Sequence, residues 1–173
     1  TVPITVPAHQ GLNPRDAAAF CTDDRLENDR QFIFFNRTTQ IRFQHVDYAG
    51  IVFYPRFLEM LNCLVEDWFE EALERPFSKM HETNGIPTVD LKVQFKKAAR
   101  LGETLTKKLW VKHLGGASLL CGFQFEDEKG TICLEGEVTL VNVAFTENRD
   151  NIKAKAFSED MKHKINKYLL VTL

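Results

Sequence analysis

The sequence predicts an α+β fold, in which an antiparallel sheet carries one long amphipathic helix on one face. The segment after Pro55 repeats apolar residues at the three-and-four spacing of a helix, whereas several others alternate apolar and polar residues as strands do. The order is a strand, the helix and then four strands, and each strand has an apolar side that needs a cover. With 173 residues and a hydrophobic content of 44%, the chain can bury one sizeable core. We therefore expect one domain with a tail.

The tail is expected at the amino end. Residues 1–29 contain several prolines and the polar run TDDRLENDR, and they show neither helical nor strand periodicity. They predict an irregular or partly ordered extension, and residues 30–173 form the folded domain in this interpretation. The extension has no basic start followed by an apolar core, so it does not resemble a secretory signal.

The first strand and the helix follow. A run rich in β-branched and aromatic residues begins at residue 31, and residues 39–44 alternate between two sides, which predicts a strand that runs to about Gln44. Proline suits the first turn of a helix, so Pro55 marks the start, and Arg75-Pro76 marks the end of a helix of roughly 18 residues. Its two faces differ: the apolar face holds Phe57, Leu61, Leu64, Val65, Trp68 and Ala72, and the polar face holds Glu59, Asn62, Glu66 and Glu70.

Four strands are expected after the helix. The first is half-buried, because apolar residues alternate with polar ones at Val89, Leu91, Val93 and Phe95. Strand-like runs then occupy 103–113, 117–127 and 131–145, and turn signals separate them. The last run should form a hairpin with the run before it. Ser158 as an N-cap, with two acids after it, predicts a short C-terminal helix within 158–170.

Charge and cysteine usage exclude several classes of function. The chain has 22 Lys+Arg and 24 Asp+Glu, so its net charge of -2 gives no general attraction to nucleic acid. No stretch approaches the roughly 20 apolar residues of a membrane span. Cys21, Cys63, Cys121 and Cys133 have no CxxC spacing, and the histidines do not cluster with them, so we expect no metal site. They are interpreted as buried thiols of a protein in a reducing compartment, the cytoplasm.

The most informative segment is HVDYAGIVFYP, residues 45–55, in which Asp47 stands where the first strand ends. The N-terminus of the following helix has free N–H groups and positive partial charge, and the acid should lie close to it. Asp47 and Gly50 could simply cap the helix and form the turn. Alternatively, the carboxylate, the helix terminus and the apolar residues 51–54 could form a catalytic site with an oxyanion-stabilising donor. The residues alone leave both interpretations open.

The run FQHVDYAGIVFYPRF, together with the helix that contains Trp68, resembles the start of the 4-hydroxybenzoyl-CoA thioesterase family. In that family an Asp is followed by an Ala-Gly turn, an aromatic pair and a proline. The similarity continues through GIPTVDLKVQFKKAARLGETL and the hairpin after Gly115-Gly116, and covers about residues 33–172. Only the amino-terminal extension lies outside it.

This resemblance implies the hot-dog fold, a bent antiparallel sheet wrapped around one long central helix. It implies a homodimer or homotetramer with active sites between protomers, an acyl-CoA substrate, no cofactor and no metal. By position, Asp47 matches the catalytic acid, which attacks the thioester carbonyl or directs water onto it. Tyr54 matches the residue whose backbone N–H polarises the thioester oxygen. Asn62 stands where the 4-hydroxybenzoyl-specific members have a helix acid, so that substrate specificity is not implied.

Other residues are candidates with weaker support. The family's basic trio for the CoA nucleotide is replaced here by Leu114-Gly115-Gly116, so its role could fall to nearby basic residues, namely Lys112, His113, Lys97 and Arg100. His45, two residues before Asp47, could orient the acid or act as a base. Gly50 and Ser118 are further candidate substrate contacts, although turn formation alone explains both. Glu59 and Glu66 compete with Asp47, because a sister lineage of hot-dog thioesterases uses a helix glutamate.

Two other functions remain open at this point. A hot-dog hydratase or dehydratase would pair an acid with a histidine, for which only His45 and Asp47 are suitably placed. A non-catalytic acyl-CoA-binding module would use Asp47 as a turn residue only. Fold-level analogy does not separate these from a thioesterase.

Overall fold

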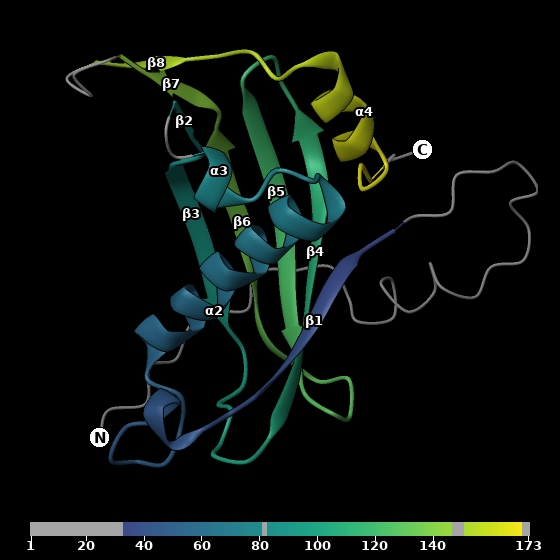
Figure 1. The fold of residues 1–173 in the computed structure, drawn as a ribbon. Helices are drawn as coiled ribbons and strands as arrows, with labels where there is room; N and C mark the ends of the chain where they lie inside the picture. Colours follow the sequence, from purple (N-terminus) through teal and green to yellow (C-terminus); the bar gives the residue numbers. More distant parts are fainter. Residues whose placement is uncertain (1–32, 81–82, 147–150, 171–173) are drawn as a thin grey trace, which may run out of the picture. The chain divides into compact units, whose positions relative to one another are not determined.

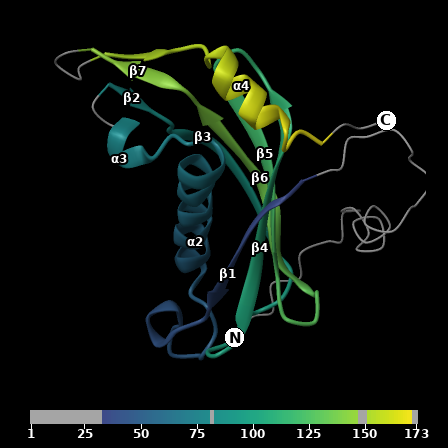
Figure 2. The same ribbon diagram turned by 45° about the vertical axis from the view of Figure 1, so that its right-hand side comes forward.

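The computed structural model describes residues 33–80, 83–146 and 151–170. The expected extension over residues 1–29 and Cys21 therefore lie outside the described residues. The described part confirms the predicted α+β class and the hot-dog fold, because a curved antiparallel sheet wraps around one long helix (Figures 1 and 2).

The main sheet has five strands in the order β1-β4-β5-β6-β3, and all its pairs are antiparallel. The strands are β1 (Phe35–Gln40), β3 (Thr88–Phe95), β4 (Thr104–Leu114), β5 (Ser118–Glu126) and β6 (Ile132–Val141). β5 and β6 form the expected hairpin. Inward-facing residues of β4, β5 and β6 are almost fully buried, among them Leu109, Phe123 and Leu134. The sheet thus supplies one side of the core.

Helix α2 (Tyr54–Asp67) supplies the other side and lies against the concave face of the sheet (Figure 2). It continues as a π-helical turn, η2 (Trp68–Ala72), so the predicted length is confirmed. The predicted apolar face is buried or half-buried, and the predicted polar face is exposed. Trp68 and Phe69 have no exposed surface at all. The sequence period was sufficient to identify both faces because a two-faced helix has one way to bury its apolar stripe.

A smaller sheet was not predicted. It contains β2 (Asn84–Gly85), β7 (Val143–Phe145) and β8 (Ile152–Ala154), and a short helix, α3 (Phe77–Met80), precedes it. The run 131–145, predicted as one strand, is divided at Asn142. The Asn142 side chain donates to the Lys155 carbonyl at 2.7 Å, while its backbone N–H donates to the Ala117 carbonyl at 2.8 Å. These bonds turn the chain out of the main sheet.

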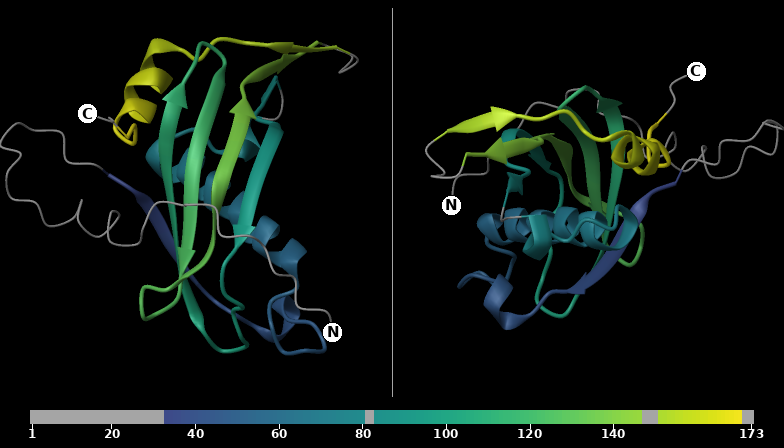
Figure 3. Two further views of the ribbon diagram at one scale, coloured as in Figure 1. Left: turned by 180° about the vertical axis from the view of Figure 1, so that it is seen from behind. Right: turned by 45° about the horizontal axis from the view of Figure 1, so that its top comes forward.

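The C-terminal helix α4 (Glu159–Asn166) is confirmed, with Ser158 as its N-cap. The Ser158 hydroxyl accepts from the Met161 N–H at 3.3 Å, and Met161 and Ile165 are buried. After α4, the chain pairs with β4 at Val111, which lies beyond the part of β4 that pairs with β1. In Figure 3, α4 lies at the end of β4 that is remote from the start of α2.

Three sequence-based expectations were wrong in detail. The first strand ends at Gln40, and residues 43–45 form a 3-10 turn, η1 (Phe43–His45), instead of continuing the strand. β3 is an edge strand, so Val89 and Phe95 are 59% and 50% exposed where a half-buried alternation was expected. Cys63 is exposed on α2, whereas Cys121 and Cys133 are buried as expected.

Candidate active site

Asp47 lies in a tight turn that brings two chain segments together. Its N–H donates to the Ile51 carbonyl at 3.1 Å, and the Gly50 N–H donates back to the Asp47 carbonyl at 3.0 Å. Gly50 has φ of 73°, which a residue with a side chain rarely adopts. One carboxylate oxygen, Oδ1, accepts the Ala49 N–H at 2.8 Å. No described residue donates to Oδ2, and the side chain is exposed. Asp47 thus presents a free carboxylate oxygen.

The turn folds the chain back on itself, so that Asp47 lies opposite Ile51, three residues before the start of α2. Val46 and Val52 pair as an isolated antiparallel bridge, and the Phe53 N–H donates to the His45 carbonyl at 3.0 Å. Tyr54 is the first residue of α2, and Pro55 follows with no N–H to offer. Among the described residues, none accepts the Tyr54 N–H. This unpaired donor lies at the positive end of the helix, where it can stabilise developing negative charge.

A loop after β3 supports the turn from the other side. The Val52 N–H donates to the Ala99 carbonyl at 2.9 Å, and Ile51 pairs with Arg100 as a bridge. The Gly102 N–H donates to the Ile41 carbonyl at 2.9 Å, which ties the same loop to the end of β1. The acid therefore rests on a framework of backbone hydrogen bonds from three segments, and this framework fixes its position.

Aromatic side chains lie exposed next to the acid. Phe53 and Tyr54 are 48% and 59% exposed, and their rings contact each other edge to face with centroids 5.6 Å apart. Tyr54 also contacts Phe95 of β3, with centroids 6.3 Å apart. Residues 51–54 were expected to wall a pocket, but only Val52 is fully buried. Among the described residues, no second wall faces this apolar surface.

His45 does not point at Asp47 as strand alternation predicted, because it closes the η1 turn instead. Its ring Nδ1 accepts the Arg42 backbone N–H at 2.9 Å, and its backbone N–H donates to the Arg42 carbonyl at 2.9 Å. Burial lowers the pKa of His45, and the positive charges of Arg56 and Arg42 add to this, against an opposing effect of Glu59. The ring is therefore neutral at neutral pH.

The candidate CoA-binding residues separate into two groups. Lys112 and His113 line a cavity of about 480 Å³ beside α4, which is also lined by Gly115, Gly116, Lys162 and Asn166. Ser118 lies at the same end, since the Gly115 N–H donates to its carbonyl at 2.8 Å. Ten residue steps of β4, roughly 33 Å, separate this end from the Asp47 end. Within one chain, these residues are therefore not brought together with the acid.

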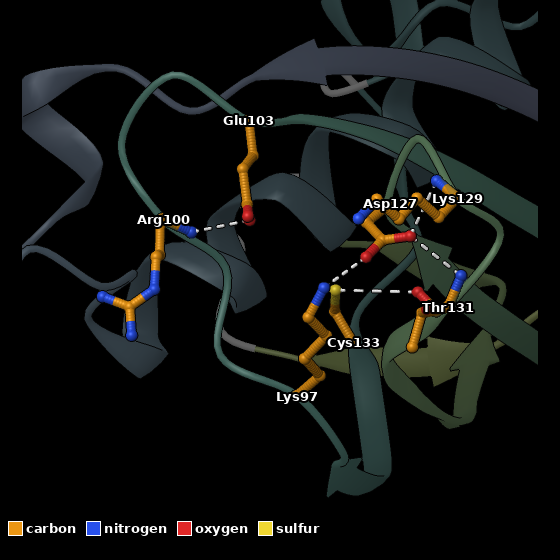
Figure 4. A network of polar contacts seen from close by, with 7 residues as sticks. All are labelled: Lys97, Arg100, Glu103, Asp127, Lys129, Thr131 and Cys133. Atoms are coloured by element: carbon orange, nitrogen blue, oxygen red, sulfur yellow. Dashed lines mark hydrogen bonds and ion pairs between the residues drawn. The ribbon is translucent and has the colours of Figure 1, made fainter.

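Lys97 and Arg100 lie at the Asp47 end, but they differ in availability (Figure 4). Lys97 forms an ion pair with Asp127, which also accepts backbone N–H groups of Thr131 and Lys129 at 2.9 Å. The Lys97 bond and these N–H groups lower the pKa of Asp127 to about 2. In Figure 4 the Arg100 guanidinium extends away from this network, while the Arg100 backbone N–H donates to the Glu103 side chain. No described residue accepts a hydrogen bond from the guanidinium. Arg100 is therefore the freer cation.

The polar residues of α2 that were considered for the site differ in their surroundings. Both carboxylate oxygens of Glu59 accept from Arg56, at 2.8 and 2.9 Å. Glu66 and Asn62 are exposed. Asn62 follows Tyr54 by eight residues, roughly 12 Å along the helix axis. Arg56 and Phe95 were not singled out from the sequence: a surface arginine and a strand-end phenylalanine carry no local signal, and only the fold places them beside His45 and Tyr54.

A second cavity of about 680 Å³ is lined by residues 40–44 with Leu101 and Gly102. Neither this cavity nor the one beside α4 is lined by Asp47 or Tyr54. No group of His, Cys, Asp and Glu that could hold a metal ion occurs among the described residues. None of the described helices is long and apolar enough to cross a membrane.

The fold is that of a class of proteins named for thioester chemistry. The family model of the thioesterase-like superfamily matches residues 41–165, and the chain belongs to this superfamily. By family, it is a thioester hydrolase. The more specific resemblance to the 4-hydroxybenzoyl-CoA thioesterases remains a prediction. No curated protein sequence gives a significant match.

Solved structures support the fold assignment. A 1,4-dihydroxy-2-naphthoyl-CoA thioesterase from Synechocystis superposes with a TM-score of 0.69 at 18% identity, covering 78% of this chain and 96% of that one. The Staphylococcus aureus protein SAV2348, solved in complex with CoA, gives a TM-score of 0.71 at 14% identity, covering 82% and 89%. A gentisyl-coenzyme A thioesterase gives 0.65 at 20% identity, covering 73% and 98%. At these identities the likeness establishes the fold.

Proposed function

We propose that this protein is an acyl-CoA thioesterase that hydrolyses a CoA thioester to a free acid and CoA. Asp47 acts as nucleophile or general base, and the Tyr54 N–H donates to the thioester oxygen. The observation that carries the proposal is the pairing of Val46 with Val52, because this bridge holds a free carboxylate oxygen and an unpaired helix N–H on neighbouring segments. CoA is the proposed carrier because two of the structural neighbours are named CoA thioesterases and another was solved with CoA.

The chemistry suits this arrangement. Attack on a thioester moves negative charge onto the carbonyl oxygen, and a preorganised donor at that point is worth about 3 to 4 kcal/mol in comparable sites. The carboxylate supplies the attack from the other side of the carbonyl, either directly or through water. A hydratase or dehydratase is less well supported, since the His45 Nδ1 is already occupied by the Arg42 N–H.

The acyl group is proposed to lack a para-hydroxyl. Asn62 is exposed on the polar face of α2 and offers a neutral amide where a phenol would need a carboxylate. A mismatched buried hydroxyl typically costs about 1 to 3 kcal/mol. Aliphatic acyl groups and unsubstituted aryl groups avoid this cost, so they are the preferred candidates.

We also propose that the site is completed by a second copy of the chain. The aromatic surface of Phe53, Tyr54 and Phe95 lies exposed beside the acid, and Phe95 belongs to the edge strand β3. Pairing of β3 with its symmetry mate would cover this surface and give the carboxylate a second wall. Of the basic candidates, Arg100 is proposed to meet CoA phosphate from the same chain, whereas Lys112 and His113 could serve only a CoA molecule bound at another protomer.

Replacing Asp47 by Asn tests the proposal. The change keeps the size and the Ala49 hydrogen bond but removes the charge, so turnover should fall by at least roughly 100-fold while the circular dichroism spectrum and melting temperature stay close to wild type. Activity is measured by thiol release from aliphatic, benzoyl and 4-hydroxybenzoyl CoA thioesters. Glu128→Gln, which changes an exposed acid in the turn between β5 and β6, is the matched control.

Each alternative predicts a different result in the same assay. A chain that releases no thiol from any ester while binding CoA would be a binding module. Near-normal turnover of Asp47→Asn would refute the assignment, and Glu59→Gln and Glu66→Gln would then identify the carboxylate. A clear preference for 4-hydroxybenzoyl-CoA would refute the argument from Asn62.

A further inference from the structure

His45 makes one hydrogen bond with its ring and another with its backbone carbonyl, and these bonds link the segment before Asp47 to the start of α2. The ring accepts the Arg42 N–H, which closes the η1 turn, while the His45 carbonyl accepts the Phe53 N–H at the start of α2. Asp47 lies two residues after His45, and Tyr54 directly follows Phe53. A displacement of His45 would therefore move the acid and the helix N–H relative to each other.

The His45 ring takes the place of the side chain that completes a capping box. In a capping box, the side chain of the third residue in a helical turn accepts the N–H of the residue before the turn, and Glu or Gln usually fills this role. Here Arg42 is that preceding residue and His45 is the third. A histidine can accept this bond only through an unprotonated nitrogen.

We infer that His45 is a positioning residue: its neutral imidazole locks the η1 turn, which leads into Asp47 and is bonded to the start of α2, and releases this turn on protonation. This inference rests on the proposed function, since it concerns the same site. A proton on Nδ1 would set two N–H groups against each other at 2.9 Å, and the bond to Arg42 would be lost. Turnover should then fall without loss of the residues that carry out the reaction.

The charges around the ring favour the neutral form. Arg42 of the same turn and Arg56 of α2 oppose a positive ring, and Glu59 of α2 favours it. Because Glu59 is itself bound by Arg56, its influence is partly compensated. With burial added, the pKa of His45 lies below its usual 6.5, so the turn stays locked at neutral pH and opens only under acidic conditions.

Two substitutions and a control test this role in the full-length protein. His45→Gln supplies a carbonyl oxygen that accepts the Arg42 N–H at every pH, and His45→Ala supplies none. His163→Gln changes an exposed histidine of α4 and is the control. The turnover number and KM are measured from pH 4.5 to 8 with one CoA ester.

The expected results differ between the variants. His45→Ala should lose about 10- to 100-fold in turnover at pH 7.5, with KM changed much less, because a misplaced acid affects the chemical step. His45→Gln should keep most of the turnover and should lose the decline in turnover that protonation of His45 causes below pH 6.5. His163→Gln should follow the wild-type profile.

Several outcomes would overturn the inference while leaving the proposed function intact. An unchanged acidic decline in His45→Gln, normal turnover in His45→Ala, or a His45→Gln protein that fails to fold would each contradict the role of the neutral ring. Failure of the proposed function has a separate signature, namely an active Asp47→Asn variant.

Discussion

Lys107 is a lysine whose side chain is largely buried in the main sheet. It is 4% exposed and shares the inward side of β4 with Leu105 and Leu109. Burial lowers its pKa, although the negative charge of Asp67 acts in the opposite direction. No ion pair or hydrogen bond of its side chain occurs among the described residues. A buried ammonium without a close partner is destabilising.

Replacing Lys107 with Met should therefore stabilise the fold at pH 7 by about 1 kcal/mol, or roughly 2 to 4 °C in melting temperature. The folded-state pKa lies below the unfolded value of about 10.4, so the penalty is fully present below the folded-state pKa and fades as pH rises toward 10.4. The gain of the variant should shrink accordingly. Thermal melts of both proteins at pH 7 and pH 10 check this, and a less stable variant at pH 7 would show that the amine has a partner.

At the residue scale, sequence reasoning could propose Asp47 and Tyr54 because they occupy one short motif. It could not place His45, since a strand and a 3-10 turn orient the third residue differently and the alternation of 39–43 favoured the strand. It also treated Lys97 and Arg100 alike. Their difference depends on Asp127, which is 30 positions from Lys97 in sequence and reaches it only through the β5–β6 turn.

Among the elements, β6 shows how tightly the sheet packs at one glycine. A Cβ on Gly136 would lie 1.9 Å from the Lys92 carbonyl oxygen and 2.8 Å from the Phe123 ring. The backbone atom cannot yield without breaking the pairing of β6 with β3, which runs through Val93 and Gly136. The glycine allows β3 and β6 to approach each other where the sheet curves.

Gly136→Ala should thus cost more than about 2 kcal/mol, because an overpacked site inside a sheet forces backbone shifts. The matched control is Gly116→Ala, where an added Cβ meets nothing within 4 Å. Urea denaturation of the two variants gives the comparison. Equal midpoints would mean that the strands tolerate the methyl group.

The elements were largely predictable from periodicity, but their interruptions were not. The pattern over 131–145 is continuous, and the break at Asn142 comes from its bond to Lys155, in a segment with no strong pattern of its own. The exposure of β3 likewise depends on its place in the sheet order, because an edge strand and a central strand can share one alternating sequence.

For the whole molecule, the proposed pairing of β3 makes assembly a testable property. Val89 and Phe95 are apolar, exposed and on the edge strand. Substituting both with Lys should shift the mass measured by light scattering from at least twice that of the chain toward that of one chain, since like charges would meet across the twofold axis. Turnover should fall with the mass, because each site loses its second wall.

A comparison variant separates this effect from general loss of solubility. Ile152 of β8 is apolar and 61% exposed but belongs to the smaller sheet, so Ile152→Lys should change neither mass nor turnover. An active wild-type monomer would rule out the proposed dimer.

Cys63 gives α2 an exposed thiol that can react with thiol reagents. It neighbours Asn62, while the thiols of Cys121 and Cys133 are buried and burial raises the pKa of both. A colorimetric reagent that counts the CoA released by hydrolysis will therefore also titrate the enzyme through this cysteine, and single-turnover measurements need that background subtracted. The same reaction offers a probe, because its rate with and without a bound ester reports whether the acyl chain covers this stretch of the helix.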